Sequence, residues 1–397
     1  MKRPWTLKYL IALLILSGVS KQSHAQLDST IKTAADTLIH KFQDVDIPDS
    51  TFWDKMMYPH RWYVKQLLSS HPTDFDTSFI LNTKRNLTLT LPVSQKYYGF
   101  NLNDLQKHER LKFLPNNPYQ VGFNFSTVIL TFGFAPGLAF GARPGRGSTA
   151  SHDYQLTLIG RRVITDVNFQ QYKGFYEHQA SEDDFSLQTP GSIILRPDVG
   201  VLSFGVNTLF IFNYKKYSLR GAFSFTDVQR KSAGSFMAGF YHSSVSFFSS
   251  DSTLIRYPFV HEFSTLFSEV TKIFVNTFGV SGGYGYTYVY KKLILSAALN
   301  VGFGGQLINY TRKEGESHLM PLNGSLNING KMAIRYDNLR FFSGLMATYD
   351  NNYAFNPGLF NTENYIGKIV FFVGYRFNIK KNGRKVLKAM GLIDYAH

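Results

Sequence analysis

Apolar and polar residues alternate with a period of two along most of the chain after residue 85. From Leu322 to Tyr336 the even positions are Leu, Ile, Met, Tyr or Gly, and the odd positions are Asn, Ser, Lys, Ala or Arg. From Phe274 to Tyr290 one face carries most of the Phe, Val and Tyr residues, and the other is nearly all small. This pattern predicts β-strands with one apolar and one polar face. Several exceed the roughly 9–11 residues that cross a bilayer with tilt.

Alternation alone leaves open which face meets water. A soluble lipocalin or sandwich buries its apolar face, whereas an outer-membrane barrel turns that face to lipid. The polar face here is small and uncharged for the most part, as a barrel interior is. Tyr and Phe crowd the strand ends, for example at Tyr286, Tyr290, Tyr375 and Phe377, where interfacial aromatic residues belong. We therefore expect an all-β protein, an antiparallel up-and-down transmembrane β-barrel over residues 83–379.

The spacing of turns sets the expected number of strands. Very short connections, at 126–127, 160–161, 213–215, 291–292 and 337–338, alternate with longer polar ones, as turns and loops alternate in a membrane barrel. Counting Thr253–Phe263 as a strand gives about 14 strands with both ends on the periplasmic side. Pro258 argues against that strand, and 12 strands is the alternative.

Residues 1–25 have the pattern of a signal peptide. Lys2, Arg3 and Lys8 precede an apolar run from Tyr9 to Leu16, and Ser23-His24-Ala25 is a suitable cleavage site that leaves Gln26 first. The alternative is an uncleaved anchor helix, but the run is short for about 30 Å of hydrocarbon. Beyond residue 25 no apolar run approaches 18 residues. The pattern predicts export to the cell outer membrane of a Gram-negative bacterium.

Two segments flank the expected barrel. Residues 26–82 show helical spacing of apolar residues and an aromatic cluster that includes Phe52, Trp53 and Trp62. We expect a short helical segment in the periplasm or a plug, with a loosely ordered linker as the alternative. Residues 380–397 form a basic C-terminal tail that we expect to be a short helix at the barrel mouth.

Composition narrows the function classes. The chain has no cysteine, which excludes disulfides and thiolate metal sites. Charged residues make up 17%, and the formal net charge is +15. No basic run with interleaved aromatic residues stands out, so we expect no nucleic-acid partner. Nothing in the sequence requires a cofactor or a metal.

A set of basic residues falls on the polar faces of the predicted strands. They are Arg220, Lys331, Arg335, Lys368 and Arg376. Facing lipid, each would cost about 2–4 kcal/mol near the bilayer midplane, so we expect them to point into the lumen. The acids placed there with them are Asp166 and Asp337. These residues either brace the wall through hydrogen bonds or line an open lumen that favours anions.

Enzyme motifs are few and weak. Gly279–Gly283 fits G-x-S-x-G. A nucleophile elbow needs a strand, a turn and then a helix, but this match lies inside an alternating strand with no helix after it. His152-Asp153 and His178 with the acids at 182–184 allow an alternative, a barrel-resident hydrolase or acyltransferase with its site at the rim. We expect a protein that is not an enzyme and has no catalytic residue.

Four blocks of sequence resemble a known family. They are Pro190–Asp198, Phe210–Lys216, Gln229–Phe236 and Gly283–Tyr288, and they are similar to domain of unknown function 4421, a family of exported proteins from Bacteroidota. The resemblance covers roughly residues 75–380 and implies location and fold, but no catalytic residue. Gly374–Ile379 also resembles the last-strand signal read by the barrel assembly machinery, although 18 residues follow it.

These patterns predict an outer-membrane β-barrel protein that is monomeric and non-enzymatic. Its role is either structural or ligand-binding, or it passes solutes passively through a basic lumen. The small-residue face of Val275–Thr287 either leaves room for a ligand or seats the N-terminal helices. The partners implied are outer-membrane lipid, the barrel assembly machinery and a small anionic solute. The N-terminal segment is too short for the large plug domain of an active transporter.

Overall fold

The computed structural model describes residues 75–82, 86–116, 119–127, 130–138, 141–179, 193–250, 253–255, 269–355 and 360–378. The predicted signal peptide, most of the predicted segment 26–82 and the basic tail 380–397 lie outside the described residues. The elements, in chain order, are β1 (Ile80–Asn82), β2 (Asn86–Asp104), β3 (Glu109–Leu114), β4 (Tyr119–Val121), β5 (Phe123–Ser126), β6 (Leu130–Leu138), β7 (Ala150–Ile159), β8 (Val163–Gln179), β9 (Ile194–Ile211), α5 (Leu219–Phe223), β10 (Asp227–Gln229), β11 (Ala233–Ser249), β12 (Val270–Tyr290), β13 (Leu293–Arg312), β14 (Ser317–Leu319), β15 (Asn323–Asp337), β16 (Phe341–Phe355) and β17 (Phe360–Asn378).

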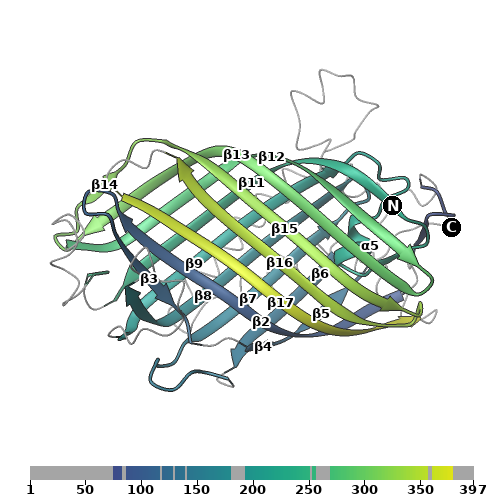
Figure 1. Cartoon of the computed structure of the whole chain (residues 1–397), viewed down its shortest axis with the longest axis horizontal. Coiled ribbons are helices and arrows are strands. Elements are labelled where there is room, and N and C mark those ends of the chain that lie inside the picture. Colours follow the sequence, from purple (N-terminus) through teal and green to yellow (C-terminus); the bar gives the residue numbers. More distant parts are fainter. Residues whose placement is uncertain are drawn as a thin grey trace, which may run out of the picture.

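The described strands close into one antiparallel ring (Figure 1). Around the ring the order is β2, β4 with β5, β6, β7, β8, β9, β11, β12, β13, β15, β16 and β17, where β4 and β5 form one strand interrupted at Gly122. β17 then pairs with β2 over all 19 residues of each strand, which leaves no free edge. The all-β barrel fold is confirmed. The described ring has twelve strands, the alternative number, and not fourteen.

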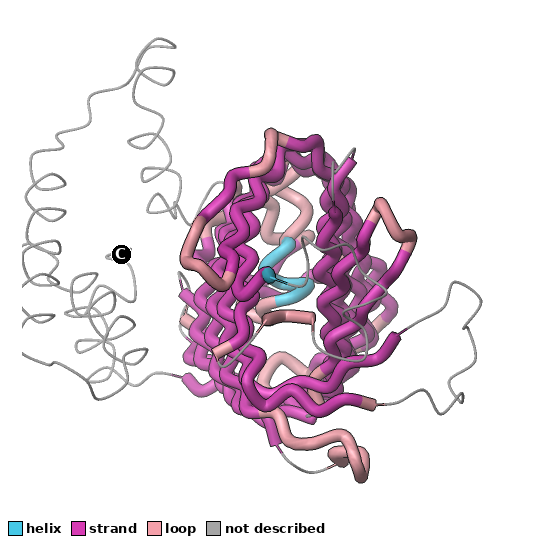
Figure 2. Tube along the Cα trace, turned by 90° about the vertical axis from the view of Figure 1, so that its left-hand side faces the viewer, coloured by secondary structure: helices cyan, strands magenta, loops and turns pink. Residues whose placement is uncertain are grey.

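Neither extra strand of the count of fourteen is part of the wall in the described ranges. Thr253–Ile255, the described part of the segment expected to be a strand, is irregular. The short connection expected at 213–215 is not a hairpin turn. These residues belong to a longer connection, residues 212–232, which we call the insert. The insert joins β9 to β11, carries α5 and β10, and lies inside the ring, where Figure 2 shows the α5 helix.

Side chains of the wall alternate as the sequence pattern predicts. The outer face carries large apolar side chains such as Val280 and Phe236, which are 69% and 70% exposed. Between its ends the inner face carries many Thr, Ser, Asn and charged side chains, and Arg335 and Arg376 are fully buried inside. The exposed apolar outer face and the buried charges are the reverse of the distribution in a soluble barrel.

The two ends of the ring differ. One end, here called the short-turn end, holds the connections β5–β6, β7–β8, β12–β13 and β15–β16, together with the insert. The other, the long-loop end, holds the longer connections. There β3 pairs with both β2 and β8, so it bridges the wall above the shorter strands β4 to β7. Figure 1 shows β3 and α5 at opposite ends of the molecule.

None of the helices in the described ranges is long and apolar enough to cross a membrane.

Candidate functional site

The interior at the long-loop end is filled by an apolar cluster. It contains Phe100 of β2, Phe113 of β3 and Phe247 of β11, with ring centroids of Phe100 and Phe247 3.9 Å apart. Leu254 and Ile255, from the connection between β11 and β12, are fully buried in the same cluster. Burial of this many apolar side chains stabilises a closed end of the barrel.

Arg196 of β9 fastens the connection that carries Leu254. Its guanidinium donates to the backbone oxygens of Thr253 and Leu254 at 2.8 and 2.6 Å and forms an ion pair with Glu177. It also binds both carboxylate oxygens of Asp198, at 3.0 and 2.9 Å. Arg196 and Asp198 belong to the family-like block 190–198, so this part of the motif has a structural role here. A fork of guanidinium donors suits such bidentate pairing.

The insert closes the short-turn end. Arg335 of β15 donates to the backbone oxygen of Gly221 at 2.6 Å, and Arg376 of β17 donates twice to that of Phe225, at 3.2 and 3.1 Å. These carbonyls lie in and just beyond α5, where a helix leaves acceptors without internal donors. Asp337 balances the charge: it binds Arg376 in bidentate fashion at 2.8 and 2.9 Å and lies 3.2 Å from Arg335. Two wall arginines thus hold the insert.

A second ion pair lies within the insert itself. Arg220 of α5 binds Asp227 of β10 through two nitrogens, at 2.5 and 2.9 Å, and Ser218 caps α5 while donating to the same carboxylate. Burial alone would raise the pKa of Asp227, but Arg220, Arg161 and Ser218 outweigh it and hold that pKa below its ordinary value. β10 also pairs with β1, which places the described residues just before the wall against the insert.

The small-residue face of β12 seats aromatic side chains. A Cβ added at Gly285 would lie 2.4 Å from the hydroxyl oxygen of Tyr217, which belongs to the insert. A Cβ added at Gly279 would lie 2.7 Å from the hydroxyl oxygen of Tyr241 of β11. At Gly285 the described segment seated on this face is the insert, and the N-terminal helices expected there lie outside the described residues.

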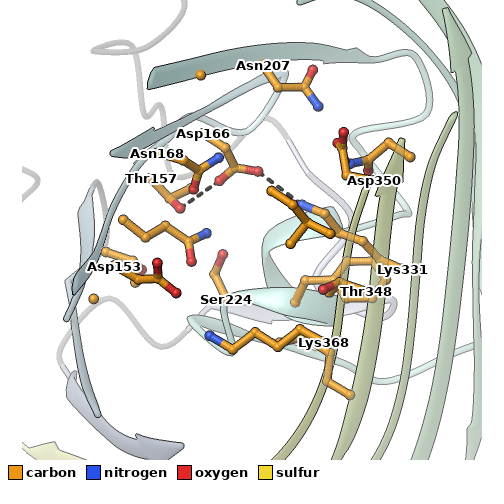
Figure 3. Close-up of a pocket in the computed structure, with 18 of the residues that line it drawn as sticks. Asp153, Thr157, Asp166, Asn168, Asn207, Ser224, Lys331, Thr348, Asp350 and Lys368 are labelled. Carbon is orange, nitrogen blue, oxygen red and sulfur yellow. Dashed lines mark hydrogen bonds and ion pairs between the residues drawn. The ribbon is translucent and has the colours of Figure 1, made fainter. Parts of the chain in front are cut away.

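Between the apolar cluster and the insert lies a polar cavity of about 300 Å³ (Figure 3). This volume is at the lower limit of about 300–1,000 Å³ that small-molecule sites occupy. Among the described residues, the charged side chains that line it are Lys96, Asp153, Asp166, Lys331, Asp350 and Lys368. Asn, Gln, Ser and Thr side chains make up much of the rest.

The charged groups form two centres. In the first, the ammonium of Lys96 lies 2.8 Å from Asp153, which also accepts from Gln120 at 2.8 Å and from the hydroxyl of Tyr172 at 3.0 Å. Lys368 extends into the cavity beside this centre (Figure 3).

In the second centre, Lys331 lies 3.1 Å from Asp166, which also accepts from Thr157 at 2.7 Å. Asp350 accepts from the amides of Asn327 and Asn329, at 3.3 and 2.6 Å.

The five basic residues singled out from the sequence all lie inside the ring, but in different places. Lys331 and Lys368 line the cavity, and Arg335 and Arg376 hold the insert. Arg220 is on α5 and not on a wall strand, because the segment that carries it leaves the wall. The acids Asp166 and Asp337 are the partners of Lys331 and Arg376.

Sequence reasoning missed most of the interior acids. Asp153 and Asp350 line the cavity, Asp227 lies in the insert, and Glu177 and Asp198 bind Arg196. For the acids that lie on wall strands, alternation with apolar neighbours could have shown that they face the interior. The described cavity lining carries three lysines and three aspartates, so the expectation of a basic lumen is wrong for this part of the interior.

Those residues considered for enzyme chemistry that the structure describes are not assembled into a site. Strand alternation exposes His152 on the outer face, while Asp153 points inward to Lys96. The side chain of His178 and residues 182–184 lie outside the described part. Ser281 of the G-x-S-x-G match lies in the middle of β12, with strand on both sides. Among the described residues, no three His, Asp or Glu side chains gather as metal ligands would.

Fold and interior together define a class: a closed antiparallel barrel with an apolar outer face, whose polar cavity lies between an apolar cluster at one end and the insert at the other. Residues 74–377 match the domain of unknown function DUF4421. The chain belongs to this family.

Solved barrels with low sequence identity are similar to the chain. The beta domain of the Bordetella autotransporter BrkA is 9% identical, with 74% of this chain and all of that one covered and a TM-score of 0.32. The translocator domain of the autotransporter NalP from Neisseria meningitidis is 10% identical, covering 83% and 100%, with a TM-score of 0.32. The P. putida toluene transporter TodX is 9% identical, covering 74% and 91%, with a TM-score of 0.25. A comparison with curated proteins finds none that matches.

Proposed function

We propose that this protein is an exported, monomeric, non-enzymatic barrel of the outer membrane that binds a small polar solute in its closed interior. The observation that carries the location is the inverted distribution of side chains: large apolar groups cover the outer face, and charged groups are buried inside. In water the outer face would be a very large exposed apolar surface, far beyond what soluble monomers tolerate. In a bilayer the same face is solvated by lipid.

Aromatic residues support the same location. Exposed aromatic side chains ring the short-turn end of the outer face, namely Tyr288, Tyr290, Tyr336, Phe341, Tyr375 and Phe377. Tyr and Trp favour the boundary between hydrocarbon and headgroups because one end of the ring is apolar and the other is polar. This belt fits a boundary of the membrane just beyond the short turns.

The closed interior favours binding over steady conduction. Apolar side chains fill the long-loop end, and the insert fills the short-turn end. The lining of the cavity is balanced in charge, so it gives no reason to prefer anions. Passive solute passage is the second candidate function, and it requires the insert to leave the barrel.

The location is tested by membrane fractionation and by gel mobility with and without heating. We expect recovery with the outer membrane and faster migration of the unheated protein, as a closed barrel resists unfolding in detergent. Recovery from the periplasm as a soluble protein would contradict the proposal.

The role is tested by recording currents in planar bilayers. We expect the full-length protein to show no steady conductance and a variant that replaces residues 214–230 by a short turn to conduct. Steady conductance of the unaltered protein would favour an open pore. Turnover of a phospholipid, peptide or acyl substrate that is lost in His152→Ala or His178→Ala would contradict the absence of chemistry.

A further inference from the structure

The two charged centres of the cavity are opposite in sign. Lys96, Lys368 and Asp153 bring two positive charges against one negative charge. Asp166, Asp350 and Lys331 bring two negative charges against one positive charge. In each centre one group stays outside the ion pairs: among the described residues, Lys368 forms no ion pair within 4 Å, and neither does Asp350.

The register of the strands keeps these two groups close but apart. Lys368 of β17 pairs directly with Thr348 of β16, and Asp350 lies two residues further along β16. Such diagonal neighbours lie about 7–8 Å apart, with Cβ atoms somewhat closer. Lys368 is also the direct partner of Lys96 across β2 and β17. Like charges directly opposite each other are destabilising, so an anionic group placed beside Lys368 would relieve an unfavourable contact.

The Asp350 carboxylate can accept more hydrogen bonds than it receives. Each oxygen of the Asp350 carboxylate accepts one amide hydrogen bond, whereas an ionised carboxylate has about four acceptor positions. Capacity therefore remains for a cationic donor. Lys331 is as near to Asp350 by register as Lys368 is, and it is engaged with Asp166.

We propose that the cavity binds a small zwitterionic solute of amino-acid or dipeptide size, with its carboxylate at Lys368 and its ammonium at Asp350. This inference rests on the proposed function and specifies the class of its ligand. The six charged groups of the lining sum to zero, so a ligand with no net charge adds no uncompensated charge to an enclosed space, where charges interact strongly. A simple anion or cation would satisfy one centre only.

The test uses three probes of similar length: 4-aminobutyrate with both charges, butyrate with the negative charge and butylamine with the positive charge. The full chain is diluted from urea into detergent micelles with each probe present, so that entry does not depend on opening of the barrel. Bound probe is measured by native mass spectrometry, and gel mobility confirms folding. We expect 4-aminobutyrate to bind at least tenfold more tightly than either single-charge probe.

Two substitutions assign the ends of the ligand. Lys368→Met and Asp350→Asn should each weaken 4-aminobutyrate binding about tenfold or more, while both barrels still fold. Lys272→Met, which removes an exposed lysine of the outer face, is the matched control and should bind normally. Equal binding of butyrate and 4-aminobutyrate, unchanged binding in both variants, or no bound probe in a folded barrel would overturn the zwitterion assignment. The proposed location and closed interior would survive each of these results, because fractionation and conductance test them separately.

Discussion

At the scale of single residues, the interior is organised by ion pairs between strands that are distant in sequence. Lys96 and Asp153 meet from β2 and β7, and Lys331 and Asp166 from β15 and β8. Alternation along one strand predicts which face a side chain occupies, and it placed four basic residues on the inner faces of wall strands. It carries no information about which strands lie across the ring, so the partners could not be assigned from the sequence alone.

Arg376 provides the sharpest test at this scale. Replacing it by Met removes a buried bidentate partner of Asp337 and the donors to the Phe225 carbonyl, leaving a buried carboxylate with less compensation. Loss of one partner of a buried ion pair costs about 3–5 kcal/mol. We expect a fall of that size in the free energy of unfolding, measured by urea titration of the purified barrel in detergent.

The matched control for Arg376→Met is Arg340→Ala. Arg340 lies in the turn beside Arg376 and is exposed, so its side chain should contribute little. Equal stability of the two variants would contradict the role assigned to Arg376.

At the scale of elements, the insert is the feature for which the sequence pattern predicted the wrong secondary structure. From Tyr217 to Phe225 apolar residues fall at every second position, which is the period of a strand. The structure forms a short helix instead, because Ser218 caps it and Arg220 finds Asp227 within the insert. These tertiary contacts outweigh the local period. The twelve wall strands had no such competing partners, so their alternation was a sound guide.

The contact between β12 and Tyr217 yields a prediction for the insert. Gly285→Leu should push the Tyr217 ring out of its place and loosen the insert, so channel openings should become more frequent in planar bilayers. Gly282→Leu is the control, because a Cβ at Gly282 meets open space. If neither variant shows more channel openings than the unaltered protein, the contact between Gly285 and Tyr217 does not hold the insert in place.

Acid should loosen the insert as well. Because the pKa of Asp227 in the folded protein lies below its ordinary value of 3.8, its ion pair stabilises the insert fully above that value and is lost as pH falls through the lowered pKa. We expect conductance of the unaltered protein to appear only at strongly acidic pH. Asp227→Asn should conduct already at neutral pH and depend less on acid. An identical pH profile for both proteins would contradict this assignment.

At the scale of the whole molecule, the barrel is defined by its outer face. The period-two pattern, the strand lengths and the aromatic strand ends were enough to predict an all-β barrel, because each depends on local sequence alone. The polar cavity could not be predicted, since its walls come from most strands of the ring and its ends from an apolar cluster and an insert. Pro258 correctly signalled that fourteen strands was too many.

The lipid-facing assignment can be measured directly. Val280→Arg places a charge on the most exposed part of β12, and the expected loss is about 2–4 kcal/mol if this position lies near the bilayer midplane. Unfolding from lipid vesicles by denaturant gives the value. Glu314→Arg, at an exposed turn of the long-loop end, should change stability by less than about 0.5 kcal/mol. No difference between the two variants would place the outer face in water.

The pairing of β2 with β17 has a consequence for how the molecule is made. One edge of β2, the first strand of the wall, pairs with the last strand β17, so a chain that lacks β17 cannot close the ring in this way. The same last strand brings Arg376, whose donors grip the insert. The strand that completes the wall is therefore also a strand that contacts the insert, so closure of the ring and positioning of the insert depend on the same residues.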